Sequence, residues 1–571
     1  MKIFFKVKER QKKIIWEIIA IILIIFFAVS LSPKRLQNDT FYTVSIGKLI
    51  LENGIDMQDH FSWHNLPYTY PHWLYDVMMY SIYNIGGWTG IYVSTCVFAS
   101  ILGICIYLVN SRLSKNKIIS FLVTIAVLYL MKSYIAARAQ LVTFILFILL
   151  VYNIEKFLEN KKIKNAIALL VIQTLIANLH VAVWPFSFVL YLPYIAEYII
   201  CELADFVFYS KTKILIIKLK IKIYQKECKN KEISMEKLEN LKRRINEAEK
   251  NLEQIQAKNI KIETKRKENS ENAYKIEMHK NTNVRWLILV MAIAVLTGLL
   301  TPLGKVPYTY TYLTMIGNTM KNINEHLPLT LAENVPIMCT LIVILALLIF
   351  TKAKIKLSDL FMLGGLTYLM FATRRQQSMF VLIGSIAFTR IVIDFMKRSL
   401  YDSVEQIDEK LINKFTIFVI IAIILIWGMY YFKQRKNEEF ISKTTYPVEA
   451  SEWILNNLDV NKIKLFNEYN YGSYLLYKGI PVFIDSRCDL YAPEYNTPTG
   501  NPDDGQDIFG DFINASGIGT YYGDIFKKYG ITHVIVYKNS KINMLIEKAD
   551  SEKYKFLYSD SDFVIYEVLE Y

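Results

Sequence analysis

The sequence predicts a mainly α-helical, polytopic membrane protein with about eleven transmembrane helices and a soluble C-terminal α/β domain. Hydrophobic residues make up 53% of the 571 residues, and the mean hydropathy is +0.25, which is more apolar than is usual for a soluble protein. Apolar runs long enough to cross a bilayer recur along the chain. After residue 432, short apolar, β-branched runs alternate with turn residues, as in small α/β domains.

The apolar runs and the charges between them define a topology. The predicted spans are 14–31, 88–110, 118–132, 141–157, 166–178, 183–200, 284–301, 337–350, 360–372, 379–395 and 415–432. The net charge of +14 comes mostly from loops that this alternation places in the cytosol, beside a basic N-terminus, so it indicates membrane orientation and not a nucleic-acid partner. Residues 72–85 are expected to lie against the membrane, because this choice keeps every cytosolic loop basic.

Four parts follow from this topology. They are an N-terminal membrane half at 1–200 with an outer loop at 32–87, a cytosolic insertion at 201–283, a C-terminal membrane half at 284–432, and an extracytoplasmic α/β domain at 433–571. Six cysteines form no metal-binding or disulfide pattern.

The insertion at 201–283 is charged and contains a heptad seam. The seam consists of Leu238, Leu241, Ile245, Ala248, Leu252 and Ile255. This spacing predicts a helical hairpin or coiled coil. Either it docks a coiled-coil partner through 234–262, or it is a solvated insertion without chemistry.

The outer stretch from Gln37 to Asp76 is unusually rich in chemistry-bearing residues. It contains Asp39, Asp56, Asp59, His60, His64, His72 and Asp76, although the whole chain has only seven histidines. Phe41 to Glu52 has the spacing of an amphipathic helix on the membrane surface, with Asn38 or Asp39 as its cap. The alternative is an ordinary polar loop.

Other polar residues fall at span ends on the same outer side. They are Arg138 and Gln140, Asn178 and His180, Asn324, Glu325 and His326, and Arg374 with Arg375. Ionisable groups at membrane depth are costly and usually face a cavity, a partner or an ion. Arginine binds phosphate through charge-assisted hydrogen bonds. Together these groups suit a substrate with a phosphate headgroup and a lipid tail.

In the C-terminal domain, the run Pro481–Ile484 is typical of a strand and ends at Asp485, Arg487 and Asp489. Polar residues just beyond a strand often form sites. Two interpretations stay open: these residues bind an acceptor or cap the site, or an Asp–Arg pair fixes the loop. Asn467, Tyr469 and Tyr471 follow another strand-like run and could share that edge. The composition of residues 493–523 predicts a long surface loop.

Several short motifs occur in an order that resembles a known superfamily. They are Asn38-Asp39-Thr40-Phe41-Tyr42 followed by Gly47, Asp59-His60-Phe61-Ser62-Trp63, His72-Trp73-Leu74, Arg138-Ala139-Gln140, Asn178-Leu179-His180, the run from Asn467 to Leu475, and the run from Pro481 to Arg487. In this order the chain resembles the GT-C superfamily of integral-membrane glycosyltransferases, and within it a set of bacterial members with an outer C-terminal domain. The likeness covers most of the chain outside the helical insertion.

The resemblance implies a transferase in the bacterial cytoplasmic membrane, with a cytosolic N-terminus and an extracytoplasmic C-terminal domain. It would move a sugar from a polyprenyl-phosphate donor, among membrane lipids, to an unidentified acceptor. Asp39 would be the general base or a ligand of a divalent metal such as Mg²⁺ or Mn²⁺, and Thr40 stands where the family has a second acid. The donor phosphate would be held by Arg138, Arg374 and Arg375, and the pocket would be lined by Asp59, His72, His180 and Glu325.

Two other classes of function compete with a transferase. One is a non-catalytic membrane scaffold whose outer domain binds a partner, and the other is a lipid or polysaccharide transporter. A transporter would be expected to show internal repeats, and none is evident in the sequence. A scaffold would not require the acids and arginines to converge.

Overall fold

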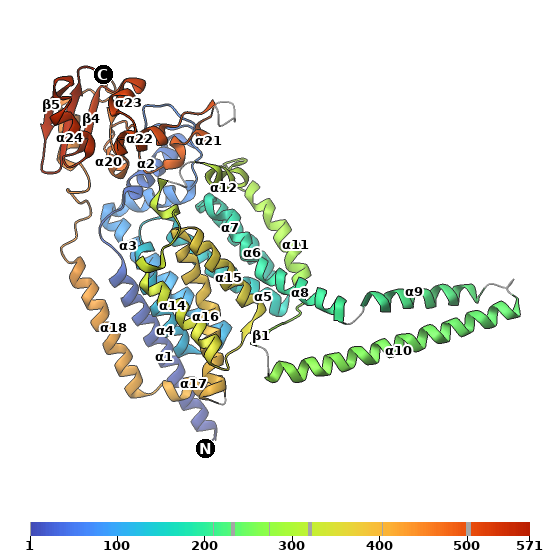
Figure 1. The fold of residues 1–571 in the computed structure, drawn as a ribbon. Coiled ribbons are helices and arrows are strands. Elements are labelled where there is room, and N and C mark those ends of the chain that lie inside the picture. The colour runs from blue at the N-terminus through green and yellow to red at the C-terminus, as the bar shows by residue number, and fades with distance from the viewer. Residues whose placement is uncertain are drawn as a thin grey trace.

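The computed structural model describes residues 2–208, 211–229, 234–272, 275–317, 322–401, 403–497 and 504–571. A bundle of helices carries a small α/β region at one end and a long helical arm at the other (Figure 1). The bundle helices are α1 (Lys2–Leu31), α3 (Trp73–Ser114), α4 (Lys117–Leu130), α5 (Ala139–Asn160), α6 (Ile163–Leu179), α7 (Trp184–Val189), α8 (Leu192–Phe208), α11 (Val284–Val295), α12 (Val306–Ile316), α14 (Val335–Phe350), α15 (Leu357–Ala372), α16 (Gln377–Ser399), α17 (Val404–Leu411) and α18 (Lys414–Arg435).

Each predicted span falls on an apolar helical segment, but the segments differ in length. Among the described residues, six are long and apolar enough to cross a membrane: Gln11–Leu31, Trp73–Ser114, Ala139–Asn160, Val181–Ala204, Arg374–Ser399 and Lys414–Arg435. The five others are shorter apolar helices, and a helix rises only about 1.5 Å per residue. The chain is therefore a multi-pass membrane protein by its candidate spans, and spanning by the shorter helices remains a prediction.

The helix α3 is divided by a sharp kink. Gly87 has a φ of +55° in the middle of an otherwise helical segment, a backbone conformation that glycine adopts without steric cost. The kink separates residues 73–86 from the apolar run that begins at Trp88. At about 1.5 Å per residue the first part is shorter than the hydrocarbon core of a bilayer, and its position against the membrane stays a prediction.

The basic loops gather at the bundle end that holds the N-terminus (Figure 1). Near α1, the Lys117 ammonium donates to Glu17 at 2.5 Å, and the Asp408 carboxylate accepts from the backbone N–H of Lys117 at 3.1 Å. Lys161 lies 3.9 Å from the centroid of the Trp286 ring. By the positive-inside rule this end is predicted to face the cytosol, and that orientation stays a prediction.

The insertion forms an antiparallel hairpin of α9 (Lys211–Glu227) and α10 (Met235–Asn272), which projects sideways from the same end of the bundle (Figure 1). The residues of the heptad seam are buried or half-buried, whereas most residues between them are exposed. Since α9 packs along α10, the seam has a partner within the chain. After the arm, β1 (Ile276–Glu277) pairs in parallel with β2 (Ile355–Lys356).

The C-terminal region is built on a four-stranded mixed sheet with the strand order β3-β4-β6-β5. Its strands are β3 (Leu465–Phe466), β4 (His533–Tyr537), β5 (Tyr554–Ser559) and β6 (Phe563–Val568), and its helices are α19 (Val448–Asn457), α20 (Tyr469–Tyr477), α21 (Pro493–Asn496), α22 (Ile508–Gly517), α23 (Tyr522–Tyr529) and α24 (Lys541–Lys548). The strand β3 is parallel to β4, and the other neighbours are antiparallel.

Two local predictions for this region were wrong. The run Pro481–Ile484 is not a strand of the sheet; its Val482 instead bridges Ser62 of the outer loop. The stretch 493–523 contains α21 and α22 and is not one continuous surface loop, while its residues 498–503 lie outside the described part of the chain. In α22 the apolar side chains of Ile508, Phe509 and Phe512 are buried. The many polar residues of the stretch around them led to the prediction of a loop.

The helix α2 (Asn38–Asn53) lies between the bundle and the C-terminal region, packed against α3 on one side and α20 on the other. Its residues from Thr40 to Gly47 are mostly buried at this junction, whereas Leu51 in its last turn is 56% exposed, and its contact with a membrane surface stays a prediction. Gly47 allows the closest approach, since a Cβ there would lie 2.1 Å from the Asp76 carbonyl oxygen. The predicted cap was also wrong: Gln37 occupies the N-cap position, and Asp39 lies in the first turn.

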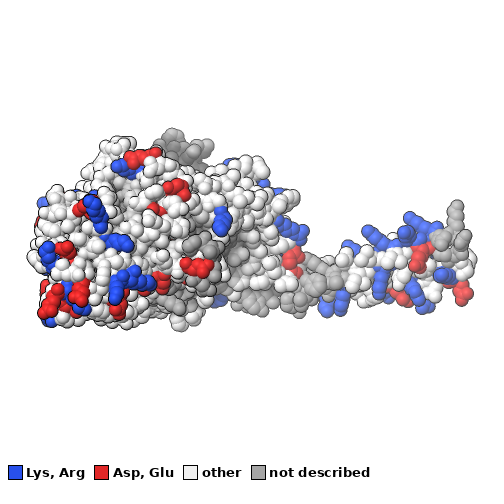
Figure 2. Space-filling model, turned by 90° about the horizontal axis from the view of Figure 1, so that it is seen from above, with Lys and Arg blue, Asp and Glu red and all other residues white. Residues whose placement is uncertain are grey.

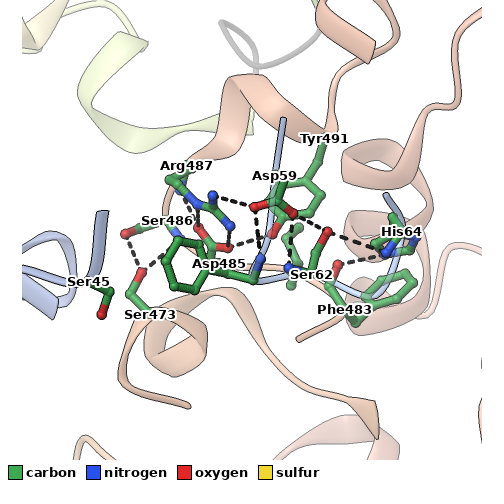
Figure 3. A network of polar contacts seen from close by, with 12 residues as sticks. Ser45, Asp59, Ser62, His64, Ser473, Phe483, Asp485, Ser486, Arg487 and Tyr491 are labelled. Atoms are coloured by element: carbon green, nitrogen blue, oxygen red, sulfur yellow. Dashed lines mark hydrogen bonds and ion pairs between the residues drawn. The ribbon is translucent and has the colours of Figure 1, made fainter. Parts of the chain in front are cut away.

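A buried ion network joins the outer loop to the C-terminal region (Figure 3). Arg487 donates from Nη1 to Asp59 Oδ1 at 2.6 Å and from Nη2 to Asp485 Oδ2 at 2.7 Å, and these side chains are at most 3% exposed. Tyr491 donates to Asp485 at 2.5 Å, and Ser62 donates to Asp59 at 2.5 Å. Burial alone would raise the pKa of Asp59, but Arg487 and Ser62 hold it below the ordinary value.

Replacing Arg487 is expected to destabilise the junction strongly. Arg487→Ala would leave two carboxylates buried without their cation, a change that costs about 3–5 kcal/mol. The purified variant should unfold at a lower temperature, and its C-terminal region should be cleaved faster in limited proteolysis. The control is Lys462→Ala, which removes an ion pair with Asp459 whose lysine is 82% exposed and should change stability by less than about 0.5 kcal/mol. Equal stability of the two variants would contradict a structural role for the network.

Candidate functional site

A cavity of about 1270 Å³ lies at the end of the bundle that carries the C-terminal region. Its walls come from the start of α2, the outer loop, the start of α5, the segments around α12 and η6 (Arg374–Gln376), and residues 468–516 of the C-terminal region. The predicted site residues that line it are Asp39, His72, Arg138, His180, Glu325, Arg375, Arg487 and Asp489. All but the last two come from different loops and helix ends of the membrane part, so the fold brings together what the sequence keeps far apart.

The centre of the charged wall is Arg138, the N-cap residue of α5. Its guanidinium forms ion pairs with Asp39 Oδ2 and, at 2.9 Å, with Glu325 Oε1. Burial by itself lowers the pKa of Arg138, but the two carboxylates outweigh that effect and raise it above the ordinary value. The same ion pair lowers the pKa of Glu325, against the opposing effect of burial. Arg138 therefore stays charged and holds both acids in place.

Two histidines lie edge to face beside this ion pair. The rings of His72 and His180 are 4.8 Å apart between centroids. Thr143 donates its hydroxyl to the Ala139 carbonyl at 2.8 Å, so the His180 Nδ1–H donates to Thr143 at 3.2 Å and Nε2 accepts from Arg375 at 3.4 Å. Burial, together with the arginines, lowers the pKa of both imidazoles. Both rings are thus neutral near pH 7.

Arg375 is the cation with the most unused binding capacity. Apart from His180, the described residues offer its guanidinium no hydrogen bond and no ion pair. Several buried polar atoms of the cavity wall likewise have no hydrogen-bond partner in the described part of the chain. They are Gln37 Oε1, Asn38 Oδ1, Arg138 Nε and Gln376 Oε1. Buried polar groups are normally satisfied, so this wall is suited to a polar ligand.

Three predicted site residues do not line the cavity. Arg374 faces away and holds the neighbouring loop, donating to Asn324 at 2.7 Å and to Glu333 at 3.3 Å. Asp59 and Asp485 both form ion pairs with Arg487 in the buried network. The reason is the same in each case: a guanidinium or carboxylate with close partners is fixed by them. For Asp485 and Arg487 the structure favours the loop-fixing interpretation.

Of the residues expected to share the edge of Asp485, Tyr469 lines the cavity and donates to the Ser486 carbonyl at 3.3 Å, whereas Asn467 and Tyr471 are structural. The Asn467 side chain accepts from the Phe483 N–H at 2.9 Å and donates to the Ile484 carbonyl at 2.7 Å. Tyr471 donates to the Ile535 carbonyl at 2.7 Å. Asp489 differs from them, because it lines the cavity and accepts from Tyr310 at 2.5 Å.

Glu468 is an acidic cavity residue that the sequence analysis did not single out. Glu468 lines the cavity at the N-cap of α20, and burial raises its pKa to about 7. It directly follows Asn467, and that motif was interpreted as the edge of a strand. The sequence feature that could have identified Glu468 is its position directly before α20, the helix that contains Gly472.

The residues around Asp39 do not fit a divalent metal. Its nearest charged partner is the Arg138 guanidinium, which opposes a cation. Within the described ranges, no three His, Cys, Asp or Glu side chains are grouped in a way that could hold a metal ion. We therefore derive no chemical step through a metal.

The neutral histidine pair predicts a stability loss in acid. A buried histidine with a lowered pKa stabilises the fold fully above pH 6.5, and this contribution is lost as the pH falls, because the unfolded chain then binds more protons. At pH 5 the loss is about 2 kcal/mol for one such group. The melting temperature should fall between pH 7 and pH 5, and by less in His180→Gln. Exposed His279 provides the control, since His279→Gln should leave the pH dependence unchanged.

Comparison with known proteins does not identify a family. The chain matches no protein-family model and no curated protein. What stands is a helical protein with several candidate membrane spans and a small C-terminal mixed sheet, in which acids, imidazoles and arginines line one cavity.

Proposed function

We propose that this protein is a membrane glycosyltransferase that moves a sugar from a polyprenyl-phosphate donor to an extracytoplasmic acceptor. The observation that carries the proposal is the convergence of Asp39, Arg138 and Arg375 on one cavity at the ends of apolar helices. A non-catalytic scaffold does not require such convergence. A lipid-linked phosphate matches these surroundings, since arginines and acids stand in a cavity wall that also carries many apolar side chains, and the exposed helix surfaces below it are apolar.

Arg375 and Arg138 would bind the donor phosphate in turn. Arg375 has no carboxylate partner among the described residues, so an anion can reach it without breaking an ion pair. Arg138 already serves Asp39 and Glu325, so a phosphate that reaches it competes with at least one of them. Binding would thereby loosen Asp39 from its guanidinium at the moment the donor is in place.

The transfer itself would be a single displacement. The acceptor hydroxyl oxygen attacks C1 of the sugar while the Asp39 carboxylate takes the hydroxyl proton. The bond between C1 and the phosphate oxygen breaks, and its electron pair leaves on the polyprenyl phosphate, whose charge Arg138 and Arg375 stabilise. Displacement from the side opposite the phosphate inverts the configuration at C1. The neutral His72 would offer a hydrogen bond to the sugar without adding charge, while both ring nitrogens of His180 are already bonded to Thr143 and Arg375.

Loss of the Asp39 carboxylate should abolish turnover while leaving the protein inserted. Asp39→Asn removes the base and should lower the rate of sugar transfer by roughly 10²-fold or more. The assay measures loss of radiolabelled sugar from a panel of polyprenyl-phosphate sugars in vesicles. Asp56→Asn is the matched control, because Asp56 lies in the same outer loop, is 41% exposed and does not line the cavity. Undiminished transfer by Asp39→Asn would exclude its assigned role.

Removal of Arg375 should weaken phosphate binding specifically. A hydrogen bond to a charged group contributes about 1.5–3 kcal/mol, so Arg375→Ala should bind polyprenyl phosphate at least about tenfold more weakly. A polyprenol of the same chain length, which lacks the phosphate, should bind both proteins alike. Arg398→Ala, at the far end of α16, is the control. If wild type binds polyprenol as tightly as polyprenyl phosphate, the phosphate site is wrong. Movement of intact donor across vesicles, with the sugar still attached, would favour a transporter.

A further inference from the structure

The helix α9 of the arm has apolar residues on two opposite faces, and only one of them is covered. On one face Ile221 is 9% exposed and packs toward α10, with Ile214 and Ile217 half-buried beside it. On the opposite face Leu215, Leu219 and Ile223 are 51–60% exposed. These three recur every four residues, which places them in one stripe along the helix. The packing of the hairpin therefore does not explain this second stripe.

Lysines flank the exposed stripe. The helix carries Lys211, Lys213, Lys218, Lys220, Lys222 and Lys226 against a single acid, Glu227. At 100° per residue, Lys218 and Lys222 fall on one side of the stripe and Lys213 and Lys220 on the other. An apolar stripe bordered by lysines is the pattern of helices that lie in the interface of a membrane. The α10 surface, in contrast, carries charges of both signs.

The direction of the arm fits a membrane surface. The arm projects from the bundle at a large angle to the spans (Figure 1). Within the arm, α9 lies on the side of α10 that is nearer the C-terminal region (Figure 1). Seen from the end with the C-terminal region, the arm shows many Lys and Arg side chains, with some Asp and Glu side chains among them (Figure 2). This side of the arm would face the bilayer, because the spans extend from the place where the arm is attached toward the C-terminal region.

We propose that α9 rests on the membrane surface at the arm's end of the bundle, where its exposed stripe enters the headgroup region and its lysines bind anionic lipid headgroups. The stripe would bury its leucine and isoleucine side chains between the headgroups. The lysine stems extend along the same layer, with their ammonium groups at the phosphates. The charged α10 would cover the helix from the water side through the heptad seam. The arm is then held parallel to the membrane.

The contact can be tested by photo-crosslinking in the full-length protein. Benzoyl-phenylalanine replaces Leu219 in the stripe or, as the control, exposed Gln254 on the far side of α10. The protein is reconstituted into vesicles of phosphatidylcholine, with or without phosphatidylglycerol, and the products are identified by mass spectrometry. Lipid adducts are expected at position 219 and not at 254. They should be several-fold more abundant when phosphatidylglycerol is present.

Charge reversal tests the contribution of the lysines to this contact. Each lysine near an anionic surface contributes about a five-fold gain in binding, so Lys218→Glu with Lys222→Glu should reduce adducts at position 219 by at least about five-fold. Equal lipid adducts at 219 and 254 would overturn the proposal. So would adducts at 219 to a second copy of the chain, since the stripe would then be a protein interface. Unchanged adducts after charge reversal would overturn the part assigned to the lysines.

Discussion

The geometry of the cavity depends on one buried guanidinium. Arg487 lies between Asp59 of the outer loop and Asp485 of the C-terminal region, and all three side chains are almost fully buried. Two carboxylates without this cation would be strongly unfavourable in a low-dielectric interior. The outer loop and the C-terminal region are therefore bound to each other, and together they close the space above the helix ends. Without that closure, Asp39 and Arg138 would lie on an open surface.

The same junction is reinforced by backbone contacts that need small residues. Val482 and Phe61 are joined through their backbones, with the Val482 N–H donating to the Phe61 carbonyl at 3.1 Å. Gly472 of α20 lies so close to the following segment that a Cβ would be 2.0 Å from the Ile484 carbonyl oxygen. Gly47 plays the corresponding part between α2 and α3. Thus two glycines and one arginine hold three separate parts of the chain at fixed distances.

Charge within the cavity is arranged in an asymmetric way. Arg138 has two carboxylate partners, whereas Arg375 has only a neutral imidazole among the described residues. This leaves Arg375 open to an anion beside the Asp39 carboxylate, which Arg138 holds in an ion pair. The neutral His72 adds hydrogen-bonding capacity to the cavity without adding charge, and His180 is bonded to Thr143 and Arg375. Such an arrangement supports the proposed transfer, in which the base is released by the arrival of the donor.

The helical arm is a second surface on which apolar and charged side chains are separated. The arm separates its chemistry by face, with a buried seam between α9 and α10 and an apolar, lysine-bordered stripe on the other side of α9. Because the stripe lies far from the cavity (Figure 1), contact with the membrane there would set the position of the arm without entering the transfer reaction.

Hydrophobicity and charge in the sequence were enough to determine the class of protein, the position of every apolar segment, the break between residues 72–85 and the apolar run from residue 88, and the helical arm. These features follow from local composition and periodicity, which folding preserves. The sequence also indicated that Asp39, Arg138, His180, Arg374 and Arg375 lie at the same depth, on the outer side of the predicted spans. It could not decide which charged groups pair, because ion pairs form between residues up to 428 positions apart. Only the tertiary structure assigned Arg374, Asp59 and Asp485 to structural contacts and left Arg375 free of a carboxylate among the described residues.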